Sequence, residues 1–125
     1  MITITAEQMA ALNALSRKQF ITRATVHLQR FFPQHCATLG PAGVHAAIDY
    51  GIDRADGYGI VGERDVALYL DLMFAFGRDF DTDPALPWAA AILTDPRIPA
   101  PKQRINRLHD AALAHTADAA RAQGG

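Results

Sequence analysis

Apolar residues are most concentrated in one stretch, VALYLDLMFAF, which runs from Val66 to Phe76. Ten of its eleven residues are apolar, and a helix that is apolar nearly all round lies inside a domain rather than on its surface. At about 1.5 Å per residue it would span roughly 16 Å, well short of the ~30 Å hydrocarbon core of a bilayer. The pattern therefore predicts a buried central helix near residues 63–77, not a membrane span.

On both sides of this stretch, apolar residues recur at the three- and four-residue spacing of amphipathic helices. The first predicted helix is either continuous or broken near Ser16, and the run QHCATLGPAG over 34–43 is expected to be a loop. The predicted helices span about 6–31, 44–58, 63–77, 87–93 and 102–122. We expect one all-α domain over 1–125, with about five helices packed round the central one and a frayed tail over 118–125.

Composition and charge narrow the classes of function. Twelve Lys and Arg residues stand against thirteen Asp and Glu residues, so no global field attracts nucleic acid or an anionic membrane. Cys36 is the single cysteine, which rules out an intrachain disulfide. The N-terminus lacks a basic segment followed by an apolar run. We therefore expect a cytoplasmic protein that binds neither nucleic acid nor membrane.

Two short motifs resemble ligand sites but lack their context. Gly57, Gly59 and Gly62 spell G-x-G-x-x-G, yet a helix precedes them where a dinucleotide site needs a strand. We interpret them as a turn between helices, although backbone N–H groups at the head of the central helix remain able to hold an anion.

Three alternating carboxylates, Asp79, Asp81 and Asp83, resemble the start of a calcium loop. Pro84 and Ala90 occupy the positions where that loop needs glycine and glutamate. The expectation is that these carboxylates cap a helix that begins at Pro84 and keep the loop solvated.

The lone charge inside the central helix is Asp71. At 100° per residue it shares an edge with small and charged side chains, which are Arg64, Ala67, Ala75 and Arg78. Two interpretations stay open: the edge touches water, or its small residues admit a partner helix on which a basic group meets Asp71.

No constellation of residues predicts catalysis or a metal. The five histidines do not stand three or four residues apart on a helix, and His35 with Cys36 supplies at most two of the four ligands of a structural zinc. Nothing near Cys36 activates a thiol, and Ser16 lacks a nucleophile elbow. We expect no catalytic residue, no cofactor and no metal.

Aromatic residues gather in sequence around the central helix. They are Tyr58, Tyr69, Phe74, Phe76, Phe80 and Trp88. Core packing explains most of them, a cofactor pocket is the alternative, and any left exposed would form a patch for a partner. Phe80 and Trp88 are the members that we predict at a partner surface, beside the charged candidates Arg64, Asp71, Arg78, Asp79, Asp81 and Asp83.

The segment from about Tyr50 to Asp95, with the runs YGI, ERDVALYLDLMFAFGRDFDTDP and PWAAAIL, resembles small helical bacterial proteins encoded beside type VI secretion effectors and spike components. The matching residues are Tyr58, Gly59, Ile60, Glu63, Asp65, Val66, Tyr69, Gly77, Phe80, Asp81, Pro87, Trp88 and Leu93. The resemblance implies an accessory role, as an adaptor or co-chaperone that loads an effector or as an immunity protein that blocks one. It carries over no catalytic residue.

These observations favour a non-catalytic protein that binds another bacterial protein, such as an effector, a spike component or a toxin. As an immunity protein, it would cover a toxin's basic active site with Asp79, Asp81 and Asp83. The alternative from another class is a small-ligand module or small enzyme that uses the head of the central helix with Glu63, Asp65 or an arginine.

Overall fold

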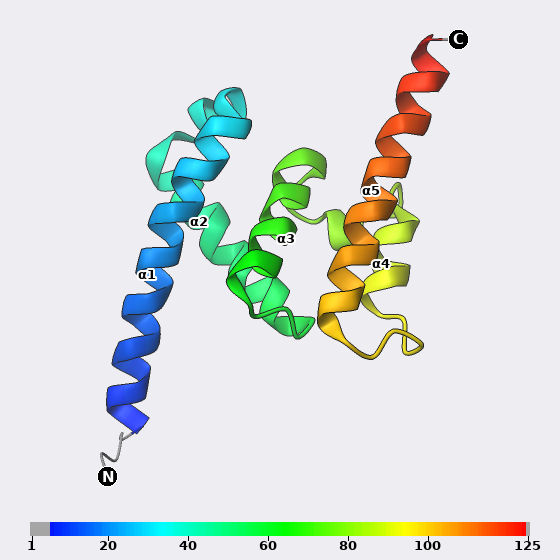
Figure 1. Ribbon diagram of the computed structural model, residues 1–125. Helices are drawn as coiled ribbons and strands as arrows, with labels where there is room; N and C mark the ends of the chain where they lie inside the picture. Colours follow the sequence, from blue (N-terminus) through cyan, green and yellow to red (C-terminus); the bar gives the residue numbers. More distant parts are fainter. Residues whose placement is uncertain (1–5, 125) are drawn as a thin grey trace. The chain divides into compact units, whose positions relative to one another are not determined.

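The computed structural model describes the backbone of residues 6–124 and the side chains of residues 16–119. This part of the chain is all-α, with five α-helices and one short 3-10 helix, as Figure 1 shows. In chain order the elements are α1 (Ala6–Phe31), α2 (Pro33–Gly57), α3 (Glu63–Phe76), η1 (Phe80–Thr82), α4 (Pro87–Leu93) and α5 (Pro101–Gly124). The predicted fold class, all-α with about five helices, is confirmed.

The connection between α1 and α2 is tighter than the sequence suggested. α1 is one continuous helix, so there is no break near Ser16, and α2 begins directly at Pro33. The loop predicted over 34–43 is therefore wrong. The helix is interrupted only at Gly40, whose φ of 73° is left-handed, and Pro41 follows it. Glycine adopts that conformation without strain, and proline is tolerated in the first turn of the resumed helix.

Contacts between residues divide the chain into two compact units, one ending at Asp49 and the other beginning at Tyr50. The prediction of a single domain over 1–125 stays a prediction. In the first unit Leu28, Val44 and Ile48 are almost completely buried. Arg17 of α1 donates from Nε to Asp49 Oδ1 of α2 at 3.1 Å, which joins the two helices of this unit.

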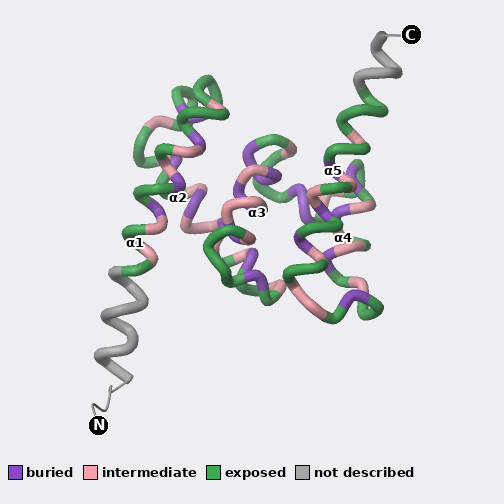
Figure 2. The backbone as a smooth tube through the Cα atoms, in the orientation of Figure 1, coloured by how far each residue is buried: buried purple, intermediate pink, exposed green. Residues whose placement is uncertain are grey.

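The second unit is built on α3, as predicted for residues 63–77. Its buried residues are Val66, Tyr69, Leu70, Leu72, Met73 and Phe74. α5 packs against both α3 and α4, and η1 also contacts α3 and α4. Figure 2 shows where buried residues lie along α3, α4 and α5. Residues on the remaining edge of α3, including Arg64 and Ala75, are exposed.

Glycines lie in the turns on both sides of α3. Gly59, with a φ of 80°, turns the chain after α2, and the N–H groups of Tyr58 and Ile60 both donate to Ala55 O. At the other end Gly77 has a φ of 120° and donates its N–H to Met73 O. The G-x-G-x-x-G motif is thus a turn between two helices, as predicted.

The C-terminal helix α5 buries Ile105, Leu108 and Ala112, while most side chains over 113–119 are exposed. Its backbone is helical to Gly124. The predicted frayed tail over 118–125 lies largely outside the described side chains. Within residues 6–124, no helix combines the length and the apolar character that a membrane span requires.

Candidate functional site: a pocket between α4 and α5

A pocket of about 760 Å³ opens where α4, the α4–α5 connector and α5 meet. Its volume lies within the range of roughly 300–1,000 Å³ that is typical of ligand pockets. Its walls combine small or aliphatic side chains with two arginines and one carboxylate. They are formed by Ala91, Ile92, Thr94, Asp95, Pro96, Arg97, Ile98, Arg107 and Ala111.

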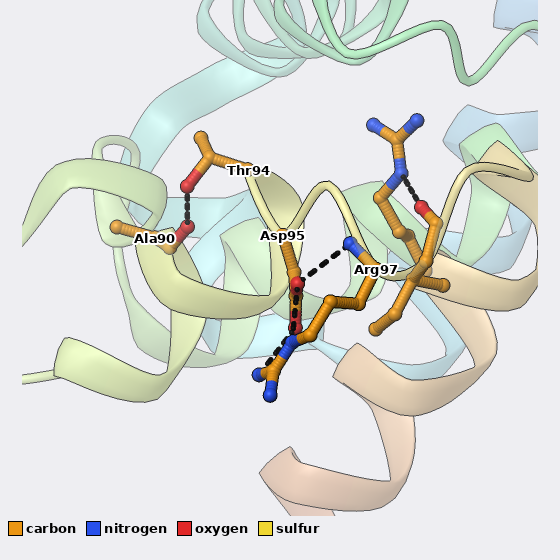
Figure 3. Close-up of polar contacts among 6 residues, drawn as sticks. Ala90, Thr94, Asp95 and Arg97 are labelled. Atoms are coloured by element: carbon orange, nitrogen blue, oxygen red, sulfur yellow. Dashed lines mark hydrogen bonds and ion pairs between the residues drawn. The ribbon is translucent and has the colours of Figure 1, made fainter.

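The connector forms a rigid polar turn at the end of α4. Thr94 caps the helix, because its N–H and its hydroxyl both donate to Ala90 O, at 3.1 and 2.7 Å. Asp95 Oδ1 then accepts the N–H of Arg97 at 2.9 Å, and the guanidinium of Arg97 folds back onto the same carboxylate, as Figure 3 shows. The N–H of Ile98 donates to Asp95 O at 3.1 Å and closes the turn.

Arg104 fastens this connector to the rest of the second unit. Its Nε donates to Ile98 O at 2.7 Å and its Nη2 to Pro99 O at 3.0 Å. Its Nη1 lies 3.3 Å from Leu93 O and 3.4 Å from Tyr58 O. One guanidinium therefore joins the carbonyl end of α4, the connector and the turn after α2. A cation also suits the negative end of the α4 dipole.

The pocket has an excess of positive charge. Both oxygens of Asp95 are used by Arg97, whose side chain is otherwise 88% exposed. Hydrogen bonds from Arg97, together with the charge of Arg107, lower the pKa of Asp95, so this carboxylate stays ionised at neutral pH. Arg107 forms no ion pair with any side chain that the structure describes. Arg107 is exposed and lines the pocket, so the two arginines and the single carboxylate of the lining leave one net positive charge.

An aromatic cluster continues the pocket wall along α4 and α5. Trp88 lies one helical turn before Ile92, and His115 lies one turn after Ala111. The rings of Phe76, Trp88 and His115 pack together with centroids 5.6–5.9 Å apart. These residues are all half-buried. We call the set the α4–α5 surface; its members are Phe76 at the end of α3, Trp88, Ile92, Ala111 and His115. Trp88, a predicted partner-binding residue, belongs to it.

A second polar cluster surrounds Asp81, which is 0% exposed. Arg54 of α2 forms an ion pair and hydrogen bond with Asp81 Oδ2, and the Tyr58 hydroxyl donates to the same oxygen at 2.8 Å. The expectation that Asp81 keeps the loop solvated is wrong. An isolated buried carboxylate is costly, and this one is tolerated because a guanidinium and a phenol both bind its Oδ2, although its buried Oδ1 accepts no hydrogen bond.

Burial and the charge of Asp81 shift the pKa values around it. Burial and the hydrogen bond to Asp81 raise the pKa of Tyr58 to about 12, and burial raises the pKa of Tyr69. Burial alone would disfavour the charged form of Arg54, but the hydrogen bond and charge of Asp81 outweigh it and raise its pKa. Tyr58 and Tyr69 therefore stay protonated and Arg54 stays charged at neutral pH, which suits a structural role.

The loop between α3 and η1 is also held by α2. Tyr50 donates its hydroxyl to the carboxylate of Asp79, and the guanidinium carbon of Arg78 lies 3.9 Å from the Tyr50 ring centroid. Tyr50 and Arg54 of α2, with Tyr58 just after this helix, stand four residues apart and bind Asp79 and Asp81. Two predicted site residues, Arg78 and Asp79, are thus exposed but already held in place.

The other predicted site residues do not converge on one place. Arg64 pairs with Asp65 at 2.9 Å, and Asp71 is half-buried on the exposed edge of α3. Asp83 accepts the N–H of Ala85 at 2.9 Å, but no helix starts at Pro84. Phe80 is 1% exposed and packs on Tyr69, so it contributes to the core and not to a surface.

The remaining aromatics also pack inward. Among the six that gather in sequence around α3, three are buried and three are half-buried. The large apolar side chains that are exposed lie elsewhere; they are Val26, Phe31, Leu39, Val61 and Leu113. The core interpretation is confirmed for the three buried members, Tyr69, Phe74 and Phe80.

The candidate metal and thiol chemistry finds no site in the described part of the chain. No three His, Cys, Asp or Glu side chains there come together in an arrangement that would hold a metal ion. Cys36 is buried, and burial raises the pKa of its thiol. A raised thiol pKa lowers the fraction of reactive thiolate at neutral pH.

Sequence reasoning missed Arg97, Arg104 and Arg107, which build the pocket. The signal for Arg97 was the motif Asp95-Pro96-Arg97, since Asp before Pro is typical of a turn whose carboxylate binds the backbone. Nothing in the sequence marks Arg104 as different from Arg107, because only the folded connector brings carbonyl groups to one of them.

The anion site predicted at the head of α3 is disfavoured by charge. Glu63 and Asp65 already occupy the first turn of α3 and place two carboxylates at its positive end.

In comparisons with known protein families, characterised proteins and solved structures, no match to this chain was found.

Proposed function

We propose that this chain is a non-catalytic, cytoplasmic protein-binding protein, acting as an adaptor or co-chaperone in a bacterial type VI secretion or toxin system. The observation that carries the proposal is the pocket between α4 and α5 with the adjoining α4–α5 surface. Its apolar wall, half-buried aromatic rings and arginine rim are the composition found at the centres of protein interfaces, where tryptophan and arginine are enriched. The resemblance over Tyr50–Asp95 supplies the bacterial setting.

The polar clusters support binding rather than chemistry. Arg54 and Tyr58 both bind Asp81 Oδ2 inside the second unit, and both oxygens of Asp95 are bound by Arg97. Because Arg97 lowers the pKa of Asp95, this carboxylate is not poised to exchange a proton near neutral pH, as a general acid or base must be. Both clusters instead hold loops in fixed positions beside the surface that a partner would meet.

The test is a tagged purification from the native cells, with mass spectrometry of the retained proteins and the tag alone as control. Recovery of an effector, spike component or chaperone in stoichiometric amount is expected for an adaptor. Recovery of the folded chain by itself, in good yield, would contradict the proposal.

An immunity protein is the alternative within the same class. Asp79 and Asp83 are the members of the acidic strip that are not fully buried, so the Asp79→Asn, Asp83→Asn double variant replaces the triple variant that the sequence suggested. If the chain covers a toxin's basic active site, this variant should protect cells less well than the wild type. Full protection by the variant would exclude that role for the strip.

A small-ligand module is the alternative from another class, and the pocket volume is the observation in its favour. A ligand at a hundred times its dissociation constant stabilises a fold by about 2.7 kcal/mol. A thermal-shift screen with phosphates, nucleotides and small carboxylates should therefore raise the melting temperature clearly if this alternative holds. A flat screen would count against it.

A further inference from the structure

We propose that the α4–α5 pocket binds a segment of the partner protein in which a carboxylate side chain stands beside an aliphatic one. This inference rests on the proposed protein-binding function and names the chemistry that the partner presents. It follows from the division of the pocket into a cationic rim and an apolar wall.

The arginines at the rim of the pocket favour a negatively charged group on the partner. The carboxylate of Asp95 is bound by the guanidinium and the N–H of Arg97, so these two residues largely cancel each other. Arg107 also acts on Asp95 through its charge, but it forms no ion pair with a described side chain. The pocket therefore carries one net positive charge, and a guanidinium binds a carboxylate through two parallel hydrogen bonds.

The apolar wall of the pocket favours an aliphatic side chain beside that charged group. Ile92 and Ala111 are half-buried, and Ile98 is 6% exposed. Their side chains leave a small apolar area beside Arg107 within the same pocket. Covering such an area with a Leu or Ile side chain removes apolar surface from water, at roughly 25 cal/mol per Å².

The pocket is held open before binding. Thr94 and Asp95 fix the end of α4, and Arg104 fixes the connector through carbonyl groups at 2.7–3.4 Å. A connector that is already ordered loses less conformational entropy on binding than a flexible one. The walls of the pocket therefore need little rearrangement to accept the segment.

The test uses a fluorescein-labelled flexible peptide that carries two Glu-Leu pairs separated by glycine and serine, and a matched peptide with Gln in place of Glu. Fluorescence anisotropy measures the binding of both peptides to the full chain. We expect the Glu peptide to bind at least about tenfold more tightly than the Gln peptide, which corresponds to 1.4 kcal/mol. Added salt should reduce this difference.

Variants on α5 locate the contact. Arg107→Glu should weaken binding of the Glu peptide by about tenfold or more, and Arg107→Gln by a smaller factor. Lys102→Glu is the matched control, because Lys102 is exposed on the same helix but does not line the pocket. Circular dichroism checks that each variant is folded. Equal binding of the two peptides, or equal effects of the changes at Arg107 and Lys102, would overturn the inference.

Other occupants give different results. Displacement of the peptide by millimolar phosphate or acetate alone would identify a site for small anions. A concentration-dependent dimer that Arg107→Glu dissociates would identify a second copy of this chain. Either result overturns the inference.

Purification from cells separates the inference from the proposed function. If the Arg107→Glu variant still recovers the partner protein from cells, the inference fails and the proposed function stands. If the peptide binds but no partner is recovered, the proposed function fails alone.

Discussion

At the scale of single residues, the clearest energetic feature is the carboxylate of Asp81, which is completely buried and relies on Arg54 and Tyr58. Asp81→Asn should destabilise the fold by about 3 kcal/mol, because removing one member of a buried ion pair leaves the other uncompensated. The effect should fall at the low end of the usual range, since Arg54 keeps 34% of its side chain exposed. Urea denaturation measures the change.

Asp79→Asn is the matched control for this prediction. Asp79 lies two residues away and is exposed, so losing its charge should cost less than about 1 kcal/mol. Equal losses of unfolding free energy for the two substitutions would show that the buried Asp81–Arg54 pair stabilises the fold no more than an exposed carboxylate does.

Each of the three tyrosines of the chain should titrate above the ordinary pKa near 10. Burial and Asp81 raise the pKa of Tyr58 to about 12, burial raises that of Tyr69, and the hydrogen bond to Asp79 raises that of Tyr50. Between pH 10 and 12 the folded state retains protons that the unfolded chain loses. Stability is therefore fully present below pH 10 and falls as the pH rises through this window.

Tyrosinate absorbance near 295 nm in the folded protein measures this titration. Tyr58→Phe should remove the component near pH 12 and leave the rest of the curve in place. A native titration centred at pH 10 would contradict the burial of these hydroxyl groups.

At the scale of elements, α2 and α3 approach closely at Gly51. A Cβ atom at this position would lie 2.4 Å from Leu70 Cδ2 and 3.2 Å from Met73 Sδ. Leu70 is itself 1% exposed and has little room to move. Gly51→Ala should therefore destabilise the protein by about 1–3 kcal/mol, the usual cost of overpacking a core.

Gly57→Ala is the control at the end of the same helix, where a Cβ atom meets nothing within 4 Å. This change should be neutral or slightly stabilising, because alanine restricts the unfolded chain. Thermal unfolding of both variants decides the point. Equal melting temperatures would mean that α2 and α3 are not in close contact at Gly51.

The connector between α4 and α5 depends on the guanidinium of Arg104. Arg104→Lys keeps the charge but cannot reach the carbonyl groups of Tyr58, Leu93, Ile98 and Pro99 together. We expect a loss of about 2 kcal/mol, the scale of one or two hydrogen bonds to a charged group. Arg107→Lys, one turn later, should stay within about 0.5 kcal/mol. Chemical denaturation of both variants tests whether the connector needs this particular side chain.

At the scale of the whole molecule, burial is distributed unevenly over the second unit. α3 buries six of its residues, whereas residues 113–119 of α5 are mostly exposed. Hydrogen exchange should therefore be slowest in α3 and fast at residues 113–119, because segments with few buried contacts open locally. Exchange at 113–119 as slow as in α3 would indicate that another surface covers this end of α5.

The sequence by itself determined the fold class and the position of the central helix, because both depend on local patterns. Apolar residues at helical spacing, Gly77 after α3 and Pro87 at the start of α4 act through their immediate neighbours. The same local reasoning failed at 34–43. Glycine and proline in this run suggested a loop, but the chain is helical there and only Gly40 departs from helical geometry.

Only the tertiary structure decided the roles of the charged residues. Asp79, Asp81 and Asp83 look equivalent in sequence, yet of the three only Asp81 is fully buried, with Arg54 and Tyr58 bound to it. Arg104 and Arg107 differ by one helical turn, and only the first meets carbonyl groups from distant segments. Whether a charge is buried, paired or free depends on residues far away in the chain, and hydrophobic periodicity carries no information about those partners.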